Sequence, residues 1–110
     1  MNEIEEQLEL SSDRFIVDLQ SSGYLNETEF SRVDLLTREL ATLWKGQAML
    51  PKQTLHTIQA VIKALKAEAP HLSERSDNVL AKARAIELTF DLILLGEDHS
   101  DRVPGTPRII

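Results

Sequence analysis

Apolar residues recur at every third or fourth position along four segments of the chain, which is the spacing of one face of an α-helix. This pattern predicts an all-α fold, a small bundle of about four helices with antiparallel helical hairpins at its core. We expect a single helical domain over residues 1–96. Residues 97–110 have no periodicity and contain two prolines, so we expect an extended or flexible tail there.

The first helix has two possible starts. Ser12 suits an N-cap, because Asp13 follows it with a negative charge that favours the first turn of a helix. Alternatively, Ser12 lies inside a longer helix that begins near Asn2 and includes the acidic residues 1–11. In both cases we expect the helix to end before the segment Ser21-Ser22-Gly23.

The second helix has the clearest start in the chain. Asn26 is a good N-cap, and Glu29 stands three residues later in a variant of the capping box. Leu25 and Phe30 have the spacing of a hydrophobic staple across this start. We expect the helix to end near Lys45, before a glycine.

The third helix lies between two prolines. Pro51 suits its first turn, and Pro70 disfavours a helical residue at Ala69. Its apolar seam faces the predicted core, and polar or basic residues occupy the opposite side at the same spacing. This basic stripe contains Lys52, His56, Gln59, Lys63 and Lys66.

The fourth helix begins at Ser73 or Ser76 and ends at Leu95, before a glycine. It carries two apolar seams, and two apolar faces need two partners. Either this helix is central in a compact bundle, or the second seam binds a copy of the protein. The second interpretation predicts a homodimer, with self-association through Leu88, Leu92 and Leu95.

Charge is unevenly distributed in a chain whose net charge is −6. Residues 1–44 carry a net −7, residues 45–84 a net +4 and residues 85–110 a net −3. The basic middle is either a docking face or an ordinary solvated helix surface. Direct binding to DNA is possible but not favoured, since four or fewer phosphate contacts on an acidic protein give weak, salt-sensitive binding.

The sequence contains no motif for catalysis or for a cofactor. It has no cysteine and no glycine-rich phosphate loop, and its histidines, His56, His71 and His99, share no metal-ligand spacing. We therefore expect a protein that is not an enzyme and holds no cofactor or metal. The absence of a signal sequence and of a long apolar run predicts a cytoplasmic protein without a membrane segment.

Three segments resemble the enterobacterial YmgB/AriR family of small regulators, over about residues 12–95. They are SSGYLNETE at residues 21–29, the helix that Lys52 opens, and the sequence RAIE at residues 84–87 before an apolar helical end. The resemblance implies a small helical dimer that acts as a connector protein in two-component signalling, linked to biofilm formation and acid stress. It also implies a structural likeness to nucleoid-modulating proteins.

Three functions are consistent with these features. The first is a non-enzymatic regulatory adaptor that binds a signalling protein, with Lys52, His56, Lys63 and Lys66 as candidate contacts. The second is an immunity protein or antitoxin that covers the active site of a basic toxin through acidic groups. Candidate groups for that role are Glu27, Asp34 and Glu39, or alternatively the acidic clusters near the two ends of the sequence. The third is a weak DNA-binding modulator of the nucleoid type.

Overall fold

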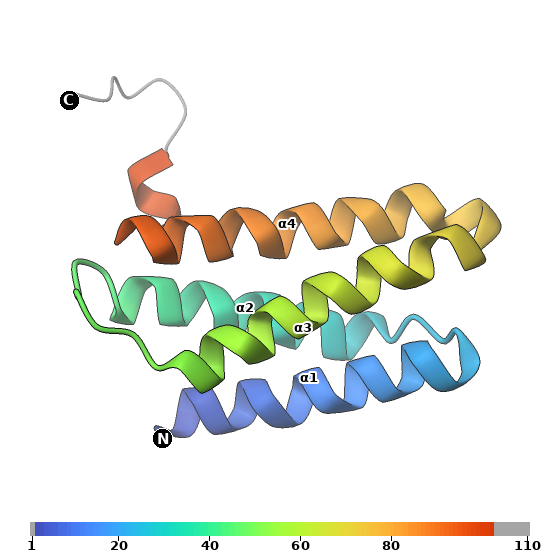
Figure 1. Ribbon diagram of the computed structural model, residues 1–110, viewed down its shortest axis with the longest axis horizontal. Helices are drawn as coiled ribbons and strands as arrows, with labels where there is room; N and C mark the ends of the chain where they lie inside the picture. Colours follow the sequence, from blue (N-terminus) through green and yellow to red (C-terminus); the bar gives the residue numbers. More distant parts are fainter. Residues whose placement is uncertain (1, 103–110) are drawn as a thin grey trace.

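The computed structural model describes residues 2–102, in which four long helices form a single bundle (Figure 1). These are α1 (Glu3–Ser22), α2 (Glu27–Leu43), α3 (Lys52–Glu68) and α4 (Ser76–Leu95). No strand occurs within the described residues. The predicted all-α class with four helices is therefore confirmed.

The four helices pair as two antiparallel hairpins, α1 with α2 and α3 with α4 (Figure 1). The hairpins stack so that α1 packs on α3 and α2 packs on α4. Because successive helices reverse direction, the C-terminal ends of α2 and α4 lie at the same end of the bundle. There the amide N–H of Gly46 donates to the carbonyl of Gly96 (3.2 Å), and both glycines adopt positive φ angles that other residues rarely adopt.

The core runs the length of the bundle and draws large apolar side chains from all four helices. Within it, the rings of Phe15 of α1 and Phe30 of α2 lie with their centroids 5.8 Å apart in a tilted geometry. The largest fully buried apolar side chains are Leu8, Phe15, Leu19, Val33, Leu40, Ile58, Val61, Leu65, Val79, Ile86 and Leu92.

Local capping chemistry accounts for several of the helix boundaries. The Asn2 side chain accepts the Glu5 amide N–H, and the Glu5 carboxylate accepts the Asn2 amide N–H, so a full capping box starts α1. The longer of the two predicted first helices is therefore correct, and Ser12 is buried in mid-helix rather than an N-cap. Asn26 caps α2 as predicted. The turn after α3 comprises η1 (Ala69–His71) and η2 (Ser73–Arg75), and α4 begins at Ser76.

Residues 97–102 differ from the prediction of an extended tail. They fold back against the bundle and include the short 3-10 helix η3 (His99–Arg102). Residues 103–110 of the predicted tail lie outside the described residues. None of the helices within residues 2–102 has the length and hydropathy that crossing a lipid bilayer requires.

Candidate interaction face

The exposed side of α3 carries the predicted basic stripe. The helix packs on α1 and α4 and buries Ile58, Val61 and Leu65 between them. Its opposite side therefore faces solvent along the whole helix. The members of the stripe are all exposed, and we call this surface the α3 face: Lys52, His56, Gln59, Lys63 and Lys66.

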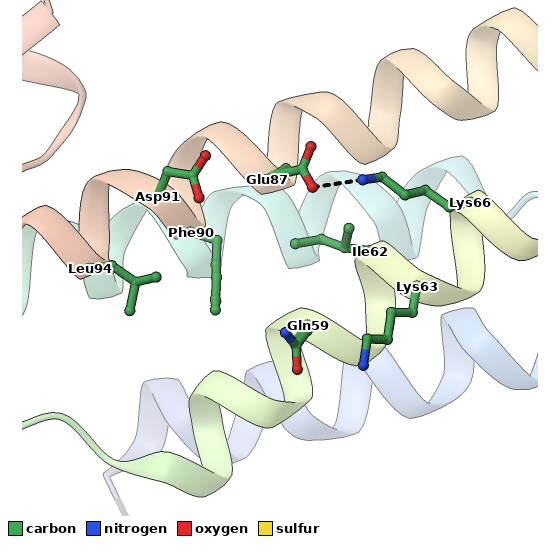
Figure 2. A pocket seen from close by; sticks show the side chains of 8 residues that line it. All are labelled: Gln59, Ile62, Lys63, Lys66, Glu87, Phe90, Asp91 and Leu94. Carbon is green, nitrogen blue, oxygen red and sulfur yellow. Dashed lines mark hydrogen bonds and ion pairs between the residues drawn. The ribbon is translucent and has the colours of Figure 1, made fainter.

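A groove of about 280 Å³ separates the α3 face from α4 (Figure 2). Its apolar lining comes from Ile62 of α3 and from Phe90 and Leu94 of α4. Leu94 is 59% exposed, so the groove offers apolar surface directly to solvent. At the other end, the Lys66 Nζ atom reaches across to the Glu87 carboxylate (2.7 Å).

A second groove, of about 340 Å³, lies on the other side of the α3 face, against α1. Its apolar lining includes Ile16 of α1 and the small side chain of Ala60 on α3. Gln59 and Lys63 line both grooves. The α3 face is consequently a polar and basic ridge with an apolar hollow on each side.

The cations of the ridge differ in their surroundings. Lys66 is paired with Glu87, whereas Lys52, His56 and Lys63 have no hydrogen-bond or ion-pair partner within residues 2–102. Exposed, unpaired cations beside apolar hollows can bind an acidic partner that also inserts apolar side chains. The same set is poorly suited to nucleic acid, because the Glu87 and Asp91 carboxylates line the adjacent groove.

The predicted acidic contacts lie on α2, which is diagonally opposite α3 in the bundle. Two of them already have cationic partners: Glu27 pairs with Lys82 (3.0 Å) and Asp34 with Arg38 (3.4 Å). Glu39 is exposed and has no partner among the described residues. The structure therefore separates the acidic and basic predictions onto different sides and leaves little free charge in the acidic set.

The predicted self-association residues on α4 differ in how exposed their side chains are. Leu88 and Leu95 are 52% and 61% exposed, whereas Leu92 is only 1% exposed. Leu92 lies one turn after Thr89, on the side of α4 where the Thr89 hydroxyl hydrogen-bonds the His99 ring (2.7 Å). The prediction for Leu92 is wrong, because its side chain is buried within the fold and is not available to a second copy.

The contacts of residues 97–102, which we call the clasp, were not predicted. Lys45, in the turn that follows α2, pairs with Asp101 (3.0 Å) and Asp98 (3.6 Å). Asp98 accepts hydrogen bonds from the Ser100 hydroxyl and amide, and the Asp101 carboxylate accepts one from the Asp98 amide. This reciprocal bonding has the four-residue spacing of a capping box. That spacing, from Asp98 to Asp101, is the feature of the sequence that could have predicted a helical turn here.

Polar contacts in the clasp shift several pKa values. The Ser100 hydroxyl, with its amide and Lys45, lowers the pKa of Asp98 from 3.8 to about 2. The Asp98 amide and Lys45 lower the pKa of Asp101, and the hydrogen bond to Asp101 raises that of Lys45. Burial lowers the pKa of His99. The clasp therefore favours charged carboxylates and a neutral imidazole.

Within residues 2–102, no three histidine or acidic side chains are grouped so that they could hold a metal ion. Comparison with protein-family models, curated proteins and solved structures finds no match for this chain. The resemblance to the YmgB/AriR family accordingly stays a prediction. The α3 face is the candidate functional site that the geometry favours.

Proposed function

We propose that this chain is a non-enzymatic regulatory adaptor of the cytoplasm that binds another protein through the α3 face. The observation that carries the proposal is the position of Lys63, an unpaired cation that lines both of the grooves beside α3. A partner segment that combines acidic groups with apolar side chains fits this surface, because each groove has room for side chains and the ridge supplies positive charge.

The specific role we propose follows the resemblance. The partner would be a sensor kinase, a phosphorelay protein or a transcription regulator, and the chain would act as a connector in bacterial two-component signalling that affects biofilm formation or the stress response. The proposal includes a homodimer, in which Leu88 and Leu95 supply exposed apolar surface on α4.

An immunity protein or antitoxin is the second candidate, and the outer side of α1 favours it. There a hollow is lined by Glu6, Glu9, Leu10 and Asp13. Leu10 is 58% exposed, and the Glu6 and Asp13 carboxylates have no partner within residues 2–102. Such an acidic and apolar surface would suit a basic toxin better than the α2 carboxylates do.

Charge reversal at Lys63 tests the proposed partner site. A partner is first captured from the host with the wild-type chain and then purified, so that its dissociation constant can be measured by calorimetry. We expect Lys63→Glu to raise that constant by about tenfold or more, because it places a negative charge opposite an acidic partner.

Arg14→Glu is the matched control, since it makes the same charge change at an exposed, unpaired arginine on α1. It should leave the dissociation constant within about twofold of the wild type, because distant exposed charges are screened by salt. Equal effects of the two variants would contradict a specific role for the α3 face. A large effect of Arg14→Glu alone would indicate that the partner binds at α1 and not at the α3 face.

A further inference from the structure

The outward side of α4 carries exposed residues in a regular order. They follow one another at intervals of three and four residues, so they share one side of the helix. Leu88 and Leu95 are its two large apolar side chains and are about half exposed or more. We call this surface the α4 stripe: Ala81, Arg84, Leu88, Asp91 and Leu95.

The two charged residues of the α4 stripe have no partner in the bundle. Neither Arg84 nor Asp91 forms a hydrogen bond or ion pair within residues 2–102. Glu87 of the same helix, by contrast, pairs with Lys66. The α4 stripe therefore presents one free positive charge and one free negative charge, on opposite sides of Leu88.

The α4 stripe is complementary to a second α4 stripe that runs in the opposite direction. Ala81 and Leu95 lie seven residues to either side of Leu88, at about 10.5 Å along the helix axis. Arg84 and Asp91 lie about 6.0 Å and 4.5 Å from Leu88 in opposite directions. Reversing the helix about Leu88 thus exchanges a small side chain with a large one and a positive charge with a negative one.

From this complementarity we infer that two copies of the chain associate through α4 in antiparallel orientation, around a two-fold axis at Leu88. In this arrangement Leu88 packs on Leu88 of the second copy, and Ala81 packs against Leu95 of that copy. Arg84 of each copy pairs with Asp91 of the other. Their positions along the helix axis differ by about 1.5 Å, the rise of one residue, and an arginine side chain can span this difference. The interface is isologous, as in most protein homodimers.

A second copy explains the α4 stripe better than an unrelated partner does. Two unpaired charges of opposite sign, placed symmetrically about an exposed leucine, satisfy each other when the partner surface is the same surface. The apolar contacts would supply most of the affinity, and the charge pairs would set the direction of the helices. This inference rests on the homodimer included in the proposed function and specifies how its two copies meet.

Charge reversal provides the test, with sedimentation equilibrium of the 110-residue chain at about 1 to 300 µM and about 150 mM salt. The wild type should dimerise. Arg84→Glu and Asp91→Arg, each measured alone, should raise the dimer dissociation constant by about tenfold or more, because each places two like-charged pairs at the interface. An equimolar mixture of the two variants should recover dimers, since every pair across that heterodimer is again of opposite sign.

Recovery in the mixture also shows that the single variants are folded, and Arg14→Glu on α1 serves as a control with no effect on dimerisation. Orientation is measured by disulfide formation, because the chain has no cysteine of its own. Ala81→Cys mixed with Leu95→Cys should cross-link, whereas Ala81→Cys alone should not, because its two copies would be about 21 Å apart.

Three results would overturn the inference. Dimers that both single variants leave unchanged would place the interface elsewhere, although the homodimer itself would stand. Cross-linking of Ala81→Cys with itself would indicate parallel helices. A wild type that is monomeric throughout would remove the homodimer altogether, while partner binding through the α3 face would still be decided separately by Lys63→Glu.

Discussion

Among individual side chains, Ser12 shows most clearly how position changes the role of a residue. Its hydroxyl is completely buried in the middle of α1 and has no hydrogen-bond partner among the described residues. A buried polar group without a partner costs free energy. At a helix start the same hydroxyl would instead satisfy a free amide, so the two interpretations of Ser12 make opposite predictions.

Ser12→Ala should therefore leave the free energy of unfolding unchanged or raise it by up to about 1 kcal/mol, because it removes an unsatisfied hydroxyl at little change in volume. Urea denaturation followed by circular dichroism measures this difference. Asn26→Ala is the comparison, since it removes a true cap and should cost about 1 kcal/mol. A similar loss for Ser12→Ala would mean that its hydroxyl does have a stabilising partner.

Among the secondary-structure elements, the boundaries were more predictable than the contacts. The caps at Asn26 and Gly96 depend on residues close in sequence, and the structure has both where local chemistry places them. Which sides of α4 are buried depends instead on its packing against α2 and α3, and on the clasp, whose His99 ring hydrogen-bonds Thr89. Helical spacing alone could not distinguish the buried Leu92 from the exposed Leu88 and Leu95.

The pKa shifts in the clasp predict that acid weakens its docking. The pKa of Asp98 is lowered, so its contribution is present above its ordinary pKa of 3.8 and is lost as pH falls toward about 2. The pKa of His99 is lowered from 6.5 by burial, so protonation favours the undocked clasp as pH falls below 6.5. Docking should therefore weaken in two steps.

Nuclear magnetic resonance of the His99 ring and the Asp98 and Ser100 amides measures both steps. The His99 midpoint should fall below 6.5, and the Asp98 midpoint should lie near 2. In Asp98→Asn the lower step should become smaller, because the amide keeps an acceptor but does not titrate, and Asp101 is then the remaining carboxylate of the clasp with a lowered pKa. Ordinary midpoints for both groups would show that the clasp does not dock in solution.

For the whole molecule, the stacking of the two hairpins decides which helix surfaces lie next to one another and which lie on different sides of the bundle. The fold class and the basic stripe followed from the spacing of residues along single helices. The diagonal placement of α2 and α3 did not, because it depends on how the hairpins stack. That stacking puts the acidic α2 residues and the basic α3 face on different sides, and it places two grooves next to Lys63.

We propose that the molecule uses one surface for a partner and another for a second copy. The α3 face combines free cations with apolar hollows, and the α4 stripe lies on the outward side of the neighbouring helix. Asp91 borders both surfaces, so the two binding events would take place close together. An adaptor of this type would present two α3 faces per dimer, which increases the strength of attachment to a dimeric partner.

The position of the partner on the bundle is the most direct measurement of the proposed function. Amide shifts of isotope-labelled protein should be recorded during titration with the purified partner. The largest changes should fall on residues 52–68 and on the part of α4 that lines the groove with Phe90 and Leu94. Changes concentrated instead on α1 around Glu6 and Asp13 would contradict binding at the α3 face and would support the immunity-protein alternative.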